Sequence, residues 1–347
     1  MNVQPLLENG QFLAMSRQQP ELFSHPIIFT LKDETQVTIT SPGVIQFIPN
    51  NEYQRSIVLS CGVHGNETAP IEICDDLVQD ILCGRLSLRQ PLLVLFANLP
   101  AMDIAERFVE ENMNRLFSGA HSQETQGIKS NIERLRAAEL EQSVVDFYQA
   151  VNSSEKWHLD LHTAIRESKN EKFAVYPFLH GQPWSQQALS LLLACGINTI
   201  LLSNAPTTTF SYFSSHQCGA NAFTVELGKV KPFGGNDMYD FQQLIDTLRT
   251  WLCQPVIELK DFNEDDFEIF KIHQIINRQQ TDFKLNFADD TPNFSDFPVG
   301  YVLAEESSTQ YIVTEKGESI VFPNAKVALG QRALLTVVPT KIDENII

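Results

Sequence analysis

Two segments of this chain are apolar along almost their whole length, and they restrict the fold more than any other feature. Residues 56–62 and residues 91–99 contain few side chains that would favour water on either face of a strand. A strand with two apolar faces must be covered on both sides, which is typical of sheets whose crossover helices lie on both faces. The sequence therefore favours an α/β fold with a mixed, mostly parallel sheet flanked by helices.

Helical segments alternate with the expected strands. In residues 68–82 apolar side chains recur at helical spacing, and Pro70 suits the first turn, where a missing N–H costs nothing. Three closely spaced β-rich segments near the start of the chain suggest an antiparallel entry into the sheet, and they are residues 25–31, 36–41 and 43–49. The other expected elements are strands at 157–163, 172–178, 197–203 and 221–228, and helices at 128–151, 185–196 and 238–253.

The pattern of expected secondary structure changes after about residue 254. Short strand-like segments and turn signals follow, without a convincing helix. We therefore predict a catalytic α/β domain over residues 1–254 and a smaller β-rich domain over residues 255–347. Residues 315–318, between two apolar segments, are typical of a hairpin turn.

Charge and composition argue against several classes of partner. Lys and Arg number 25 against 43 Asp and Glu, a formal net charge of −18, so neither nucleic acid nor a membrane is expected as a partner. The first residues lack the basic and apolar regions of a secretion signal, and no apolar run reaches the length of a bilayer span. The six cysteines are scattered without the spacing of a disulfide framework. These features predict a cytoplasmic protein.

A glycine-rich loop directly after the first apolar strand carries His64 and Glu67 in the spacing H-x-x-E. Functional groups collect beyond the carboxyl ends of strands in open α/β sheets, and an imidazole and a carboxylate are suitable zinc ligands. Gly62 and Gly65 allow the sharp turn that brings both toward one ion. The spacing alone is weak, because it also arises on solvated helices; its place after a buried strand favours a metal site.

A third ligand is expected at the end of another strand. Alternation in residues 157–163 places His158, Asp160 and His162 on one face, with His162 at the carboxyl end. Two histidines and one glutamate leave an open position for water, as a catalytic zinc site requires, so we predict one Zn²⁺ per chain. Asp160 is suited to orient a ligand imidazole, and His158 is more simply a packed strand histidine.

Glu226 lies within an apolar strand, where an unpaired carboxylate is costly to bury. It is suited to accept a proton from the attacking water and to pass it to a departing amine. The alternative is a structural ion pair, for instance with Lys229. The general base is the favoured role.

Arg107, Asn114 and Arg115 lie between the two metal-binding segments. Arginine forms forked hydrogen bonds with carboxylates, and asparagine adds a directional contact, so a carboxylate of a substrate is a natural partner. On their own these arginines are better explained as surface groups that pair with Glu106, Glu110 or Glu111.

The motifs GVHGNE, NMNRLF, DLHT and VELG, taken together and in this order, resemble the succinylglutamate desuccinylase/aspartoacylase family, which is related to the zinc carboxypeptidases. The resemblance covers about residues 40–250 and a β-rich tail. It implies a zinc carboxypeptidase-like fold, zinc bound by His64, Glu67 and His162, and Glu226 as the catalytic acid and base. It also implies that Arg107, Asn114 and Arg115 bind a substrate carboxylate and help to polarise the amide carbonyl.

Within this family the length of the chain and the stretch FTVELGKVKPFG favour a desuccinylase. The implied reaction is hydrolysis of N-succinyl-L-glutamate, a small dicarboxylate N-acyl amino acid, to succinate and L-glutamate, the last step of arginine breakdown by the succinyltransferase route. Aspartoacylases carry an arginine where this chain has His216, and their C-terminal tyrosine has no clear counterpart. The partner of the second substrate carboxylate is therefore open, with Arg166, Lys169 and His216 as candidates.

Three other functions remain open from the sequence. One is an aspartoacylase-like deacylase, and another is a metallocarboxypeptidase, which would share the zinc ligands but needs an open cleft. The third, least favoured because the ligands and Glu226 are all present, is a non-catalytic zinc-binding protein. The sequence also leaves a homodimer open.

Overall fold

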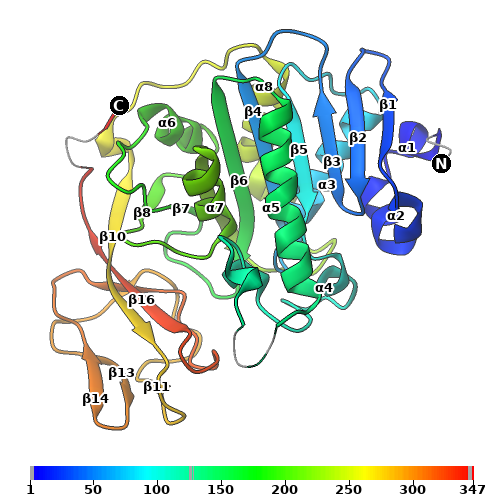
Figure 1. The fold of residues 1–347 in the computed structure, drawn as a ribbon. Coiled ribbons are helices and arrows are strands. Elements are labelled where there is room, and N and C mark those ends of the chain that lie inside the picture. The colour runs from blue at the N-terminus through cyan, green and yellow to red at the C-terminus, as the bar shows by residue number, and fades with distance from the viewer. Residues whose placement is uncertain (1–3, 125–126, 128, 343–345) are drawn as a thin grey trace.

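The computed structural model describes residues 4–124, 127, 129–342 and 346–347, and a 13-stranded sheet forms its centre (Figure 1). The strands of this sheet are β1 (Ile27–Thr30), β2 (Gln36–Ser41), β3 (Val44–Ile48), β4 (Arg55–Cys61), β5 (Leu92–Phe96), β6 (Glu155–Ala164), β7 (Phe173–Tyr176), β8 (Thr199–Leu202), β9 (Asn221–Lys229), β10 (Glu268–Asn277), β12 (Ser295–Asp296), β15 (Ser319–Val321) and β16 (Arg332–Pro339). Their order across the sheet is β1-β2-β3-β5-β4-β6-β9-β7-β8-β10-β16-β15-β12.

The centre of the sheet is parallel, as the apolar strands predict. Strands β5, β4, β6 and β9 run side by side in parallel, and every residue of β4 and β5 is buried. The three strands at the start of the chain enter antiparallel, also as predicted. Because β4 and β6 are parallel neighbours, their carboxyl ends lie at the same edge of the sheet, which brings the two expected metal-binding segments together.

Helices cover both faces of this sheet (Figure 1). Buried side chains of α5 and α7 form an apolar core on one face, and those of α3, α6 and α8 form a second core on the other. No helix in the described part of the chain is long and apolar enough to cross a bilayer. The α-helices are α1 (Gln4–Asn9), α2 (Phe12–Gln18), α3 (Thr68–Leu82), α4 (Leu99–Asp103), α5 (Ile132–Ala150), α6 (Gln186–Ala194), α7 (Phe210–Cys218) and α8 (Gln242–Cys253), and the 3-10 helices are η1 (Pro20–Phe23), η2 (Met113–Arg115), η3 (Ala120–Ser122), η4 (Met238–Phe241) and η5 (Glu264–Asp266).

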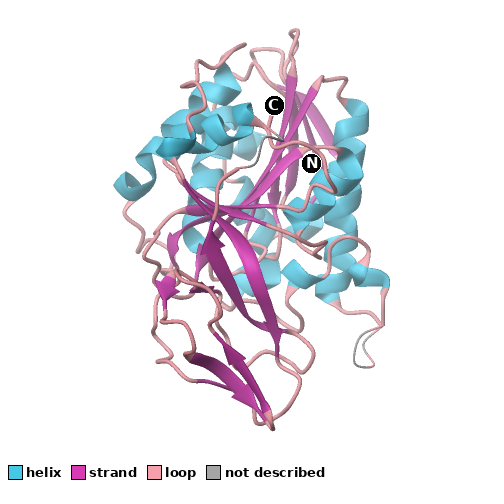
Figure 2. Ribbon diagram, turned by 90° about the vertical axis from the view of Figure 1, so that its left-hand side faces the viewer, coloured by secondary structure: helices cyan, strands magenta, loops and turns pink. Residues whose placement is uncertain are grey.

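The main sheet continues into the C-terminal part of the chain. Strand β10 pairs in parallel with β8 and antiparallel with β16, and both strands extend to a smaller sheet at the far end of the molecule (Figure 2). That sheet has the order β11-β13-β14, with β11 (Lys284–Leu285), β13 (Val302–Glu306) and β14 (Thr309–Ile312). An α/β part followed by a β-rich part is thus confirmed. The division at residue 254, one residue after α8, stays a prediction.

The hairpin predicted around residues 315–318 is wrong. Strand β14 pairs with β13 in the small sheet, whereas β15 pairs with β16 and β12 in the main sheet. The carboxylate of Glu318 accepts hydrogen bonds from the backbone N–H groups of Thr314 and Glu315, at 2.8 and 3.3 Å. The Glu318 side chain thus satisfies backbone N–H groups of the turn, and the strands on either side of the turn belong to different sheets.

Candidate active site

The loop between β4 and α3 holds the first two predicted ligands. Gly62 adopts φ +64°, and Glu67 stands at the N-cap position of α3. Gly65 packs against the backbone of α4, where a Cβ would lie 2.2 Å from the carbonyl carbon of Ala101. Glycine at position 65 therefore lets the loop approach α4 closely enough to turn His64 and Glu67 toward β6.

We expect Gly65→Ala to lower the free energy of unfolding by about 3 kcal/mol and to reduce bound metal, because the backbone of α4 cannot move aside for the added methyl group. Thermal unfolding and metal analysis of the purified variant measure both effects. Gly84→Ala is the comparison, since Gly84 has positive φ but open space around it. An equal loss of stability in the two variants would contradict the proposed clash.

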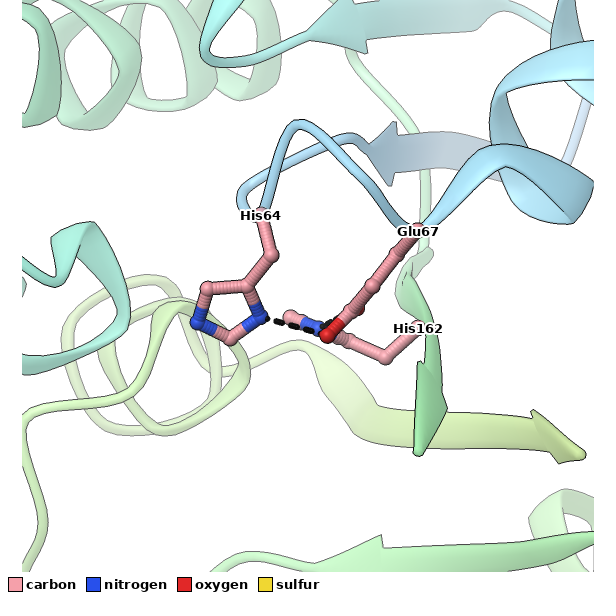
Figure 3. Close-up of side chains that lie close together, drawn as sticks. All are labelled: His64, Glu67 and His162. Atoms are coloured by element: carbon pink, nitrogen blue, oxygen red, sulfur yellow. Dashed lines mark hydrogen bonds and ion pairs between the residues drawn. The ribbon is translucent and has the colours of Figure 1, made fainter. Parts of the chain in front are cut away.

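His64 and Glu67, from the loop after β4, meet His162, near the carboxyl end of β6 (Figure 3). His64 Nδ1 lies 2.8 Å from Glu67 Oε1, and His162 Nδ1 lies 2.9 Å from Glu67 Oε2. One ligand atom from each residue lies within 4.8 Å of the others, and all three side chains are buried. The convergence predicted from two distant segments is therefore present.

The outer nitrogen of each imidazole has a partner of its own. His64 Nε2 donates to the amide oxygen of Asn112 at 2.9 Å, and His162 Nε2 donates to Asp160 at 3.0 Å. Both Nδ1 atoms face Glu67. With its proton on Nε2, His64 carries a lone pair on Nδ1, whereas His162 Nδ1 donates to Glu67 Oε2 at 2.9 Å. A carboxylate behind a ligand imidazole is the usual arrangement that orients the ring and raises its basicity.

A chain of hydrogen bonds supports Asp160 from behind. Ser60 Oγ donates to Asp160 at 2.6 Å and contacts His158 Nε2 at 2.7 Å, while His158 Nδ1 contacts Ser214 Oγ of α7 at 2.7 Å. His158 is thus a packed strand histidine with both ring nitrogens hydrogen-bonded, as predicted.

Burial and charge act in opposite directions on the three candidate ligands. Burial lowers the pKa of His64 to about 4, and the Arg107 guanidinium adds to this effect. Burial raises the pKa of Glu67, but His64 and His162 outweigh it and hold that pKa well below its usual range. Burial likewise lowers the pKa of His162, yet Asp160 and Glu67 raise it well above its usual value. Two carboxylates thus favour positive charge at His162.

These three residues fit a divalent metal ion. His64 Nδ1 is buried and, despite its 2.8 Å contact with Glu67, makes no hydrogen bond of acceptable geometry. Two neutral imidazole nitrogens and one carboxylate are the donor set of many catalytic zinc sites, which keep a further position open. They form the candidate metal group found in the described part of the chain.

Glu226 lies next to this group, on the neighbouring strand. Its Cα is the register partner of His162 between β9 and β6, and its Oε2 is buried without a hydrogen-bond partner among the described residues. Burial raises the pKa of Glu226 to about 7, with His162 acting in the opposite direction. The alternative ion pair with Lys229 is not formed, because Lys229 Nζ contacts Glu167 at 3.0 Å.

A cavity of about 680 Å³ opens beside the candidate metal ligands. Its lining includes His64, Glu226 and all three residues of the predicted substrate-binding set, which are Arg107, Asn114 and Arg115. Arg107 Nη1 also donates to Glu67 Oε1 at 2.7 Å. Residues from both parts of the chain line this cavity, since Ile272, Phe322 and Leu335 contribute from the C-terminal part.

The three candidates for a second carboxylate partner lie in different places. Arg166 lines the cavity, and its Nε donates to the carbonyl of Pro323 at 3.0 Å. Lys169 pairs with Asp296 at 3.0 Å and lines a smaller cavity of about 340 Å³. His216 stacks on His180, with ring centroids 4.5 Å apart, and is not among the described residues that line the large cavity.

Sequence reasoning missed two residues of this site. Asn112 holds the imidazole of His64, and its position inside the motif NMNRLF was a signal that could have been used. Arg332 lines the cavity from the first residue of β16. No local pattern marks that arginine, because its place depends on how β16 pairs with β10.

Comparison with known proteins gives matches over both parts of the chain. The model described as "Succinylglutamate desuccinylase/Aspartoacylase catalytic domain" matches residues 53–252, and that described as "AstE/AspA barrel-sandwich hybrid domain" matches residues 265–340. The succinylglutamate desuccinylase of Pseudoalteromonas atlantica is 55% identical over 339 residues, 97% of each chain. That of Idiomarina loihiensis is 50% identical over 331 residues, 95% of this chain and 96% of the relative.

Solved structures agree with this relationship. The crystal structure of succinylglutamate desuccinylase from Chromobacterium violaceum has a TM-score of 0.83 at 39% identity, covering 96% of this chain and 98% of the other. Murine aminoacylase 3, at 15% identity, has a TM-score of 0.57 over 84% of this chain and 98% of its own, and so shares the fold. Since the catalytic-domain match alone spans more than half of the chain, this protein belongs to the succinylglutamate desuccinylase/aspartoacylase family.

Proposed function

We propose that this chain is a zinc-dependent amidohydrolase that cleaves N-succinyl-L-glutamate to succinate and L-glutamate. The observation that carries the proposal is the meeting of His64, Glu67 and His162 beside Glu226, whose buried Oε2 has no hydrogen-bond partner among the described residues. His64 and Glu226 line a cavity of about 680 Å³. Relatives that are 55% and 50% identical over nearly the whole chain bear the name succinylglutamate desuccinylase, which supports this choice of substrate.

His64, Glu67 and His162 would hold the zinc ion. When bound there, zinc polarises the carbonyl of the scissile amide and lowers the pKa of a water molecule beside it. The protein's part is to orient both rings with Nδ1 toward the ion, which Asn112 and Asp160 do by accepting hydrogen bonds from the opposite nitrogens. The proton that His162 Nδ1 shares with Glu67 would leave when the metal binds.

Glu226 is the proposed proton carrier. Its carboxylate accepts a proton from the water that attacks the amide carbon and then donates it to the glutamate nitrogen. The amide bond breaks, succinate keeps the oxygen of the water, and glutamate leaves as the amine. The free Oε2 of Glu226 supports this role, because no other group in the described part of the chain competes for it.

Arg107, Asn114 and Arg115 are proposed to bind and orient the substrate. Arg107 fixes Glu67 and lines the cavity, so it is placed to stabilise negative charge that develops on the carbonyl oxygen. Arg115 donates one hydrogen bond to the carbonyl of Asn114 and keeps further donors for a carboxylate.

The C-terminal part of the chain supports a small substrate over a peptide. It supplies one wall of the cavity, with Phe322, Arg332 and Leu335 among the lining residues. A peptide substrate would need a cleft open along its length. The cavity thus supports small dicarboxylate N-acyl amino acids as partners. With this substrate, the proposed role is in arginine catabolism by the succinyltransferase route, and the proposed location is the cytoplasm.

The test is a comparison of three substrates with the purified, zinc-loaded protein. We expect kcat/KM for N-succinyl-L-glutamate to exceed that for N-acetyl-L-aspartate and for a short peptide by at least about a hundredfold, because unpaired charged groups in the site penalise substrates that lack their partners. Preferred cleavage of N-acetylaspartate would indicate an aspartoacylase-like enzyme, and preferred cleavage of the peptide a metallocarboxypeptidase. Bound metal without hydrolysis of any of them would indicate a non-catalytic protein.

A further inference from the structure

The charge of the large cavity is opposite to that of the chain. Six of the 25 Lys and Arg residues line it, against four of the 43 Asp and Glu residues. The six are Arg107, Arg115, Arg166, Lys229, Lys326 and Arg332. An acidic protein that concentrates cations around one cavity favours an anionic ligand there.

Three of the six cations around the cavity already have carboxylate partners within the protein, and Lys326 is exposed. Arg107 contacts Glu67 at 2.7 Å, Lys229 contacts Glu167 at 3.0 Å, and Arg166 lies 4.0 Å from Asp289. Two guanidinium groups are different. No carboxylate of the described residues lies within 4.0 Å of Arg115 or of Arg332.

Arg332 faces the cavity because of a β-bulge. Along the β10–β16 pair, Ile276 is opposite Leu334 and Asn277 is opposite Arg332, so Ala333 is an extra residue on β16. Regular alternation would place Arg332 on the face of Leu334, which is buried in the apolar core of the C-terminal part. The extra residue turns Arg332 to the opposite face, where Leu335 also lines the cavity.

The surroundings of Arg332 favour a bound anion. Its guanidinium carbon lies 5.6 Å from the centre of the Phe322 ring, which supports one face of the group. Burial and the charge of Arg107 lower the pKa of Arg332 to about 10, and burial with Arg332 and Arg107 lowers that of Arg115 well below its usual value. Three guanidinium groups thus repel one another across the space where a substrate would lie, and carboxylates between them would relieve that repulsion.

We propose that Arg332, supplied by the C-terminal part of the chain, binds one carboxylate of the substrate while Arg115 binds another. This inference rests on the proposed function, since N-succinyl-L-glutamate carries three carboxylates. It assigns the partner that the sequence left open, and it makes the C-terminal part a direct determinant of specificity. A planar guanidinium binds a carboxylate through two parallel hydrogen bonds, which a lysine cannot reproduce.

The test compares Arg332→Met with the wild type on four substrates. These are N-succinyl-L-glutamate and three analogues in which a methyl group replaces one carboxylate: N-butyryl-L-glutamate, N-succinyl-L-norvaline and N-succinyl-4-aminopentanoate. We expect the variant to lose about 10- to 100-fold in kcat/KM on the full substrate, mainly through KM. On one analogue the two proteins should differ little, and that analogue identifies the carboxylate that Arg332 binds.

Several controls separate binding from folding. Arg332→Lys keeps the charge and should recover part of the loss. Lys284→Met removes a charge from an exposed ion pair with Glu305 in the same part of the chain and should leave kcat/KM unchanged. Bound zinc and the unfolding midpoint are measured for every variant.

Two results would overturn the inference: no loss for Arg332→Met on the full substrate, or an equal loss on all four substrates. If the wild type hydrolyses none of them, the proposed function fails, and calorimetric titration with succinate and with L-glutamate then decides the matter. Weaker binding of one of these dicarboxylates by Arg332→Met than by the wild type would support the assignment. Equal binding of both would refute it.

Discussion

Replacing Glu226 by Gln is expected to reduce kcat on N-succinyl-L-glutamate by about 10²- to 10⁴-fold, the usual contribution of a general acid–base group. Glutamine has the same shape but cannot take up and return a proton. Because Glu226 is not one of the three candidate metal ligands, the zinc content of the variant should equal that of the wild type. Steady-state kinetics and metal analysis on the same preparation measure both quantities.

The control for this variant is Glu258→Gln, which makes the same chemical change at an exposed position outside the cavity. It should retain wild-type kinetics. If Glu226→Gln turns over nearly as fast as the wild type, another group accepts the proton. A loss of zinc together with activity would instead mean that Glu226 supports the metal site.

Replacing His162 by Ala is expected to remove the bound metal and to lower kcat/KM by about a thousandfold or more. The variant leaves only His64 and Glu67 from the proposed set, and loss of the ion forfeits several kcal/mol of charge stabilisation in the transition state. Elemental analysis should give close to one zinc per wild-type chain and far less for the variant. Stripping zinc from the wild type with a chelator should produce a similar loss, and added zinc should restore activity to the wild type but not to the variant.

His25→Ala serves as the comparison, since His25 is exposed and far from the candidate metal group in the chain. It should keep both zinc and activity. Wild-type zinc content in His162→Ala would show that the ion is held elsewhere. Activity of the wild type that survives complete removal of metal would argue against zinc chemistry altogether.

The convergence of His64, Glu67 and His162 could be predicted from the sequence because their positions follow from local rules. Apolar strands at residues 56–62 and 157–163 imply buried parallel neighbours, and parallel strands bring their carboxyl ends to one edge. The helix expected at 128–151 is also present as α5, which begins at Ile132 after Asn131 caps it by accepting a hydrogen bond from Arg134 N. Patterns of this kind need no knowledge of distant contacts.

Features that depend on distant pairing could not be predicted in this way. The strand over 332–339 was expected, but Arg332 faces the cavity only because one extra residue lies opposite the end of β10. The hairpin was predicted wrongly because the Glu318 carboxylate accepts a hydrogen bond from a backbone N–H of the turn. The amino-acid composition of the turn does not reveal this contact. A one-residue shift decides which face of the sheet Arg332 lies on, and a single side chain decides which sheet the strand after the turn joins.

The pairing of β10 with β8 means that the two parts of this chain share one continuous backbone ladder rather than a flexible tether. Relative swinging of the parts would break hydrogen bonds inside the sheet, so the distance between the metal group and the far wall of the cavity is held by the same framework that holds the metal group. Ligands must then enter and leave through movements of loops and side chains. To accept acids of other lengths, the protein would have to be redesigned at the residues of the far cavity wall. The two parts cannot hinge apart to make room for a longer molecule.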